Sequence, residues 1–136
     1  MKKTSMISLA LILGFTSLVQ AENATMKEPP AGAYKQVSTL VKLPAFLPGL
    51  GSLYVDPTTL PAGPFAAYDK GGQLVSSIYM IPLAQMNDKA KFASLAVAGA
   101  KTHSVDIYYN AGHPGVAEPH YHVTLWHVDP ASAKLK

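Results

Sequence analysis

Short runs of alternating apolar and polar residues recur along this 136-residue chain, and such runs are typical of β-strands. Residues 37–43, 52–55, 105–109 and 120–128 are four of them, and we expect a strand at each. The stretch FAAYDKGGQLVSSIYMI has two apolar runs around a Gly-Gly pair, which predicts a β-hairpin. Its second arm is apolar on both faces, so we expect a central strand that ends at Pro82.

A single segment repeats its apolar residues at helical spacing. From Phe92 to Gly99 they recur at i, i+3, i+4 and i+7, and Asn87 or Asp88 can cap the first turn. This pattern predicts one amphipathic helix, roughly Asp88 to Ala98. The fold class that follows is α+β: a mostly antiparallel β-sheet or small open barrel with one amphipathic helix.

The N-terminus has the layout of a secretory signal peptide, with two lysines, an apolar run from Thr4 to Val19 and a small residue at Ala21. We therefore predict a signal peptide at residues 1–21 and a secreted or periplasmic protein. The apolar run is short for a membrane span, so no transmembrane anchor is expected after cleavage. Residues 22–36 are polar with a Pro-Pro pair and predict a flexible arm, which leaves 37–136 as a single β-rich domain.

Composition excludes several classes of function. Without Lys2 and Lys3, nine of the eleven basic residues remain against eight Asp and Glu, so the exported chain is nearly neutral. The absence of arginine argues against nucleic-acid binding. The absence of cysteine excludes disulfides and thiolate metal sites, and the chain has no G-x-S-x-G elbow and no phosphate-binding glycine loop.

Four of the five histidines lie between residues 111 and 128, in AGHPGVAEPHYHVTLWHV. Side chains alternate between the two faces of a strand, so His120 and His122 share one face with Thr124 and Trp126. The opposite face carries the Tyr, Val and Leu at positions 121, 123 and 125 and is expected to face the core. The two histidines would then project together and be close enough to bind one ion.

The loop before this strand supplies further ligands, since His113 and Glu118 can fold back over its first residues. The candidate metal ligands are His113, His120, His122 and Glu118. Three nitrogen or oxygen ligands suit zinc, manganese, iron or copper. An H-x-H pair also occurs on solvated or hydrogen-bonded strand faces, which need no cofactor. His127 falls on the other face, and His103 is expected to be a hydrogen-bonded residue at a strand end.

The blocks LYVDPTTLPAGPFAAYDKGGQLVSSIYMIPL and HSVDIYYNAGHPGVAEPHYHVTLWHV carry a resemblance. They are similar to a family of small exported bacterial proteins classed as a domain of unknown function, related to a thermophile's sigma-E-regulated secreted protein. The resemblance implies export, a β-rich single domain, self-association and no established activity. Positions that recur in the family match His103, Asn110, Gly112, His113, Pro119 and His120. After the proline the family reads H-x-D-x-H and this chain reads H-x-H-x-T, so Thr124 replaces a histidine and His122 replaces an acid, and three imidazoles remain available here.

Three functions stay open at the level of sequence. The first is non-catalytic metal or ligand binding in the cell envelope. The second is a metal-dependent enzyme on an unknown small molecule, as in cupins, although the glutamate that cupins carry after H-x-H is missing between Thr124 and His127. The third is a metal-free structural module that assembles into a homo-oligomer. An enclosed pocket beside the histidines favours the second, and a histidine face between subunits favours the third.

Overall fold

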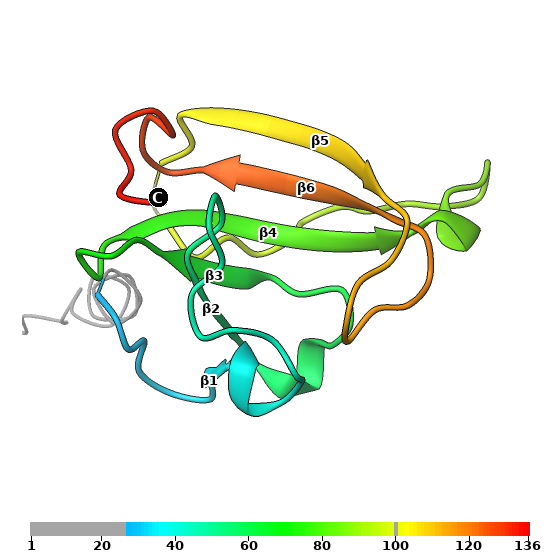
Figure 1. Ribbon diagram of the computed structural model, residues 1–136. Helices are drawn as coiled ribbons and strands as arrows, with labels where there is room; N and C mark the ends of the chain where they lie inside the picture. The colour runs from blue at the N-terminus through cyan, green and yellow to red at the C-terminus, as the bar shows by residue number, and fades with distance from the viewer. Residues whose placement is uncertain (1–26, 100) are drawn as a thin grey trace, which may run out of the picture.

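The computed structural model describes residues 27–99 and 101–136, which form one open sheet of six strands in the order β1-β2-β3-β4-β6-β5 (Figure 1). The strands are β1 (Lys35–Gln36), β2 (Ser52–Val55), β3 (Phe65–Tyr68), β4 (Leu74–Pro82), β5 (Ser104–Asn110) and β6 (His120–Trp126). Every neighbouring pair is antiparallel, which confirms the predicted antiparallel sheet. The sheet is open and does not close into a barrel, with β1 and β5 as its edge strands.

The predicted signal peptide and residues 22–26 of the predicted arm lie outside the described residues. Residues 27–36 of that arm contact the sheet region. Lys27 forms a β-bridge with Gln73, and the Tyr54 hydroxyl donates to the Glu28 carboxylate at 3.0 Å. Within the described ranges, no helix has the length and apolar content needed to span a bilayer.

The predicted hairpin is confirmed by β3 and β4, which pair on either side of the Gly-Gly turn. β4 is also the central strand that its apolar faces predict, because it lies between β3 and β6 and all nine of its residues are buried. It ends at Pro82 as expected. The short strand predicted at residues 52–55 is confirmed by β2.

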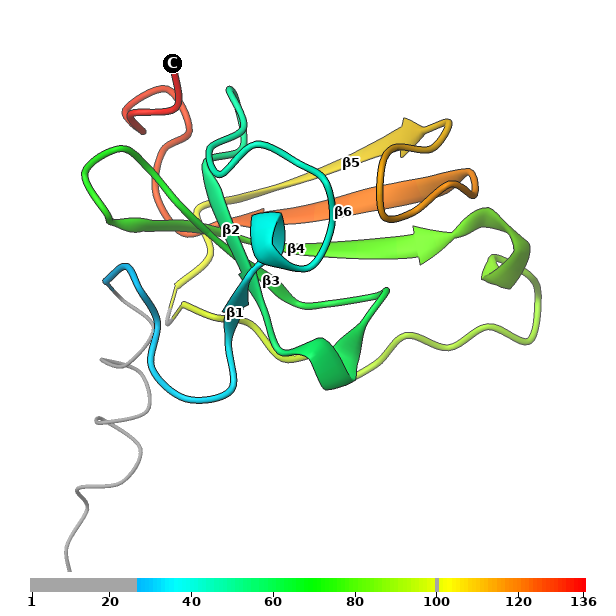
Figure 2. The ribbon, with the colours of Figure 1, turned by 60° about the horizontal axis from the view of Figure 1, so that its bottom comes forward.

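The amphipathic helix predicted from Asp88 to Ala98 is wrong. Helical elements among the described residues are three short 3-10 turns: η1 (Val37–Thr39), η2 (Pro57–Thr59) and η3 (Leu83–Gln85). After η3 the chain runs back along the sheet toward the start of β5 (Figure 2). There the Tyr79 hydroxyl donates to the Ala96 carbonyl, and the Ala98 amide donates to Ser77 Oγ at 2.7 Å. The Ala98 amide, which a helix would pair internally, and the Ala96 carbonyl are therefore both bonded to side chains of β4.

The strand predicted at residues 37–43 is also wrong. β1 ends at Gln36, and the Val37 carbonyl then accepts hydrogen bonds from the amides of Leu40 at 2.9 Å and Val41 at 3.0 Å. This tight turn leads the chain away from the strand direction, and residues 37–50 lie over one face of the sheet as a covering segment (Figure 2). The main core lies between this segment and the sheet, around Val55, Phe65, Ile78, Met80 and Trp126.

The buried face of β6 is opposite to the expected one. His120, His122, Thr124 and Trp126 are buried, whereas the residues at 121, 123 and 125 are only half-buried. The covering segment and the loop after β5 pack on the histidine face, so position in the fold overrides side-chain hydrophobicity. On the other face, Val105 and Ile107 of β5 remain 52% and 67% exposed.

The turn between β3 and β4 is organised by the buried carboxylate of Asp69. Its Oδ1 accepts hydrogen bonds from the amides of Gly71 at 2.8 Å and Gln73 at 3.1 Å, and its Oδ2 accepts from the amide of Lys134 at 3.3 Å. Burial alone would raise the pKa of Asp69, but the amide donors outweigh burial and leave the pKa below its usual value. The carboxylate thus ties the C-terminal segment to the hairpin.

We expect Asp69→Ala to lower the free energy of unfolding by about 1–3 kcal/mol, because three amides lose their acceptor. Since the pKa is lowered, the stabilisation by Asp69 is complete above about pH 4 and is lost as the pH falls through the folded-state pKa. Urea unfolding at neutral and acidic pH measures both effects, with Asp88→Ala at an exposed position as the control. Equal losses in the two variants at neutral pH would contradict this role of Asp69.

Candidate functional site

The loop between β5 and β6, residues 111–119, carries His113 back over the sheet. Its tip is a tight turn in which His113 and Val116 exchange backbone hydrogen bonds of 2.9 and 3.0 Å. Pro114 and Gly115 occupy the two central positions, and Gly115 has a φ of +92°, as the third residue of a type II turn requires. A Cβ on Gly115 would lie 3.1 Å from Val41, so the loop tip rests against the covering segment.

Gly112 fixes the start of this loop. Its amide donates to Asn110 Oδ1 at 2.8 Å, and its φ is +126°. A Cβ at this position would lie 2.4 Å from the Ala117 carbonyl oxygen. The two arms of the loop are therefore so close together that only glycine fits at position 112. The close approach holds the loop, and His113 with it, in one place.

Strand β6 supplies the other two histidines of the site. His120 and His122 lie two residues apart on its buried face, and His122 is in register with Tyr108 of β5. The two rings stack with their centroids 4.9 Å apart, and the ring of His113 stands nearly perpendicular to both. His120 is fully buried and His122 is 5% exposed, so the protein shields these two rings from solvent, and His113 is half-buried.

The three imidazoles direct their Nε2 atoms at one another. The Nε2 atoms are 2.9 Å apart for His120 and His122, 3.2 Å for His113 and His120, and 3.4 Å for His113 and His122. Two nitrogens bound to zinc at about 2.0–2.1 Å lie about 2.9 Å apart at a right angle and about 3.4 Å apart at the tetrahedral angle. The three residues therefore form a group that could hold one metal ion.

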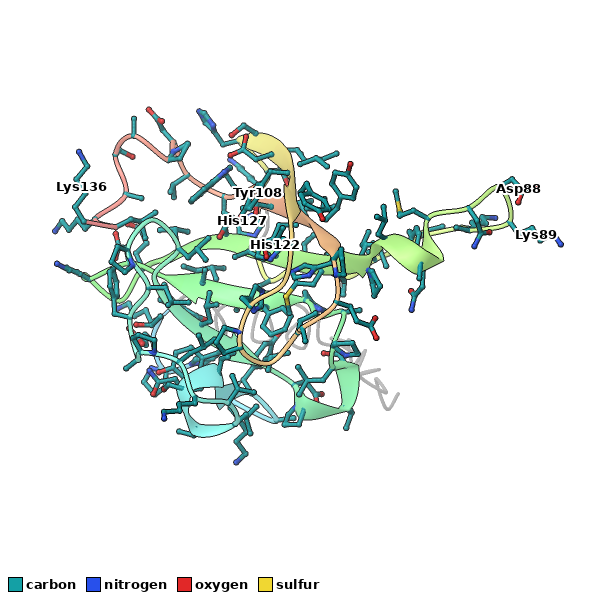
Figure 3. The ribbon with its side chains drawn as sticks, turned by 45° about the vertical axis from the view of Figure 1, so that its right-hand side comes forward. Asp88, Lys89, Tyr108, His122, His127 and Lys136 are labelled. Atoms are coloured by element: carbon teal, nitrogen blue, oxygen red, sulfur yellow. The ribbon has the colours of Figure 1, made fainter. Side chains whose placement is uncertain are left out.

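Each ring is held by a hydrogen bond at its Nδ1 atom. The partners are the Pro114 carbonyl for His113 at 3.0 Å, the Glu118 carbonyl for His120 at 2.7 Å, and the Tyr108 hydroxyl for His122 at 2.9 Å. Figure 3 shows Tyr108 beside His122. A carbonyl only accepts, so His113 and His120 carry hydrogen on Nδ1. When these rings are neutral, their Nε2 lone pairs face the centre of the group. Partners of this kind orient metal-binding histidines in proteins.

The electrostatic setting keeps His122 neutral. Burial, together with the neighbouring His120 and His113, lowers the pKa of His122 to about 4. Burial also raises the pKa of Tyr108, so the hydroxyl that contacts His122 stays protonated near neutral pH. His122 therefore offers a lone pair in place of a positive charge, which is the form that binds a cation.

An apolar cavity of about 310 Å³ adjoins the histidines. Polar groups reach its wall from His113, His122, Tyr108 and Asn110. Most of the remaining wall is apolar and comes from the covering segment and from β2 to β4, including Leu43, Leu50, Leu53, Phe65 and Met80. Leu40 and Leu60 also line the cavity and are 41% and 44% exposed, so part of its wall reaches the protein surface. An ion on the Nε2 atoms would lie at the wall of an apolar chamber.

The structure brings together three of the four candidate ligands. The fourth, Glu118, contacts His120 through its carbonyl, while its side chain is exposed and lies outside the grouped ligand atoms. His127 instead contacts Ser77 Oγ at 2.8 Å and the Lys101 carbonyl. His103 is exposed and contacts Ser104 Oγ at 3.3 Å. Binding of a metal by these residues stays a prediction.

Sequence reasoning did not pair Tyr108 with His122, and it raised a pocket near the histidine face, lined by aromatic residues such as Tyr108, only as one alternative. Tyr108 is one of seven tyrosines, and only the register of β5 against β6 brings it opposite His122. The sequence did contain a local signal that the loop turns and carries His113 back over the sheet. His-Pro-Gly-Val has proline and glycine at the positions where a type II turn needs them.

Comparisons with known proteins identify a relative without an assigned activity. No family model matches the chain, and no curated protein matches it. A crystal structure of a hypothetical protein from Thermus thermophilus is 43% identical, with a TM-score of 0.54 over 70% of this chain and 89% of that one. The function therefore has to be argued from the site.

Proposed function

Since this chain belongs to the same family as the hypothetical protein from Thermus thermophilus, for which no activity is stated, we propose from its own site that it binds one divalent transition metal ion. The proposed ligands are the Nε2 atoms of His113, His120 and His122. Binding takes place outside the cytoplasm in this proposal, as the sequence pattern of residues 1–21 predicts.

The convergence of Nε2 lone pairs is the observation that carries the proposal. His113 and His120 both hold hydrogen on Nδ1, so their Nε2 atoms present lone pairs to each other across 3.2 Å. Lone pairs at that distance repel unless a cation lies between them. His122 adds a third nitrogen within 3.4 Å of both. A proton can be shared by two nitrogens, whereas a metal ion satisfies three at once.

The ligand set favours zinc. Three imidazoles without a thiolate or carboxylate suit zinc, copper or iron, whereas manganese prefers oxygen ligands. Glu118, the oxygen ligand predicted from sequence, is exposed and lies outside the group. Zinc accepts three protein nitrogens with a fourth position left for water or another ligand.

A metal-dependent reaction on a small molecule is the second candidate, and the cavity is the observation that favours it. A metal with three protein ligands keeps an open position and can act there as a Lewis acid. The apolar wall would exclude bulk water from that position. A metal-free module that assembles with copies of itself is the function that remains if the site takes no metal.

Metal content of the purified protein without a polyhistidine tag tests the proposal. We expect about one zinc ion per chain by elemental analysis, and a 1:1 equivalence point when metal-free protein competes for zinc with a chromogenic chelator. A protein that remains empty after separate incubation with zinc, copper, iron and manganese would rule out the metal site. The histidines would then act as a hydrogen-bonded cluster within the fold.

We expect Tyr108→Phe to weaken zinc binding by about tenfold, because His122 loses the hydroxyl that orients its ring. The chelator competition measures this loss. Tyr109→Phe is the matched control, since Tyr109 is the next residue of β5, is 53% exposed and packs its ring against Tyr121. Equal zinc affinities of the two variants would show that the hydroxyl of Tyr108 does not support the site.

A further inference from the structure

The cavity beside the histidines has the size of a binding site for a small organic molecule. Its volume is about 310 Å³, and the exposed side chains of Leu40 and Leu60 form part of its wall. An apolar protein cavity of about 150 Å³ holds one benzene molecule, so this cavity has room for roughly a dozen non-hydrogen atoms. That is the size of a medium-chain aliphatic compound or of one ring with a short chain.

The lining of the cavity separates an apolar part from a polar part. Among the described residues that line it, none carries a carboxylate or an ammonium group. The polar side chains in the wall come from β5, β6 and the loop between them: Tyr108, Asn110, His113 and His122. The covering segment contributes only aliphatic side chains, such as Val41, Leu43 and Leu50. A ligand that fits this wall is apolar over most of its length and polar at one end.

The charge of the proposed ion decides which polar group that end carries. Three neutral imidazoles leave the full charge of a divalent ion uncompensated, and the group contains no carboxylate. A bare charge beside an apolar chamber is costly unless an opposite charge lies next to it. An anionic oxygen on the ligand offsets this cost, and Asn110 in the same wall carries amide N–H groups that can donate to a second oxygen. A carboxylate supplies both oxygens.

On these grounds, and resting on the proposed metal site, we propose that the cavity binds an apolar monocarboxylate whose carboxylate occupies the open position of the metal ion. The hydrocarbon part lies between the covering segment and the sheet. The carboxylate lies at the wall formed by His113 and His122. The ligand class is defined by an apolar body with a single anionic end. This class is the same for a molecule that is stored, transported or converted.

Octanoate is a suitable probe, since its ten non-hydrogen atoms are close to the roughly dozen that the cavity can hold. We expect octanoate to bind the zinc-loaded protein in a calorimetric titration and to bind the zinc-free protein at least about tenfold more weakly. Acetate, which has the head without the tail, and octanol, which has the tail without the charge, should both bind more weakly than octanoate. By linkage, saturating octanoate should tighten zinc binding by the same factor.

A variant that fills the cavity distinguishes binding of the metal from binding of the carboxylate ligand. Leu53 lies on β2, lines the cavity and contributes no group to the histidines, so Leu53→Trp should keep zinc and lose octanoate. Leu43→Phe, in the covering segment, is a second variant of the same design in case Leu53→Trp does not fold.

The outcomes of these titrations are distinct. Absence of zinc binding in the parent overturns the proposed function. Normal zinc binding without octanoate binding overturns only the ligand. Equal octanoate affinity with and without zinc shows that the carboxylate does not reach the metal and also overturns the inference. Retention of octanoate by cavity-filled variants that fold and bind zinc places the ligand elsewhere.

Discussion

Zinc affinity should fall by more than about 100-fold when His120 and His122 are both replaced by alanine. Loss of two metal ligands should lower the affinity more than loss of a residue that only orients a ligand. Both Nε2 atoms lie within 3.4 Å of the Nε2 of His113, and one remaining imidazole cannot hold the ion. Chelator competition measures the affinity. Thermal unfolding gives a second measurement, since zinc at about 100 times its dissociation constant should stabilise the parent by about 2.7 kcal/mol and leave the double variant unchanged.

The control for this experiment removes a histidine elsewhere. His103 is exposed and lies outside the group, so His103→Ala should keep the zinc affinity of the parent. His120 and His122 are buried, and circular dichroism of the metal-free variants therefore has to show that the sheet survives. A folded double variant that binds zinc as the parent does would move the metal away from these residues.

Gly112→Ala should remove most of the zinc affinity without touching a ligand. Its Cβ would lie 2.4 Å from the Ala117 carbonyl oxygen, and its φ of +126° is unfavourable for alanine. We expect a loss of about 3 kcal/mol or more in the free energy of unfolding, since strained backbone alone costs about 1–3 kcal/mol and the steric clash adds to it. Relief of the clash moves the loop that carries His113, and zinc affinity should fall about 100-fold.

Gly49→Ala separates the clash from the backbone effect. Gly49 also has a positive φ, of +83°, but a Cβ there meets no atom within 4 Å. Its variant should lose only the backbone part of the stability and should bind zinc as the parent does. Urea unfolding and chelator competition on the same preparations compare the two glycines. If both variants keep full zinc affinity, the position of His113 does not depend on the close approach at Gly112.

The strands that the sequence predicts correctly are β2 to β6, each of which has its own apolar or alternating run. The pairing of β3 with β4 also follows from the Gly-Gly turn, because strand pairing across a tight turn needs no distant partner. The region from Asp88 to Ala98 shows the opposite case. Its apolar spacing fits a helix, yet Tyr79 and Ser77 of β4 bond its backbone to the sheet, and tertiary contacts prevail over a weak local preference.

The candidate site also has features that local sequence predicts and features that it does not. Alternation along a strand determined from sequence alone that His120 and His122 share a face, and the Pro-Gly pair favoured a turn beside His113. Only the tertiary structure decided that this face is buried, that Tyr108 lies against His122 and that an apolar cavity adjoins them. Those features depend on the register of β5 and on where the covering segment packs. Both arise from contacts between residues far apart in the chain, which local sequence patterns do not specify.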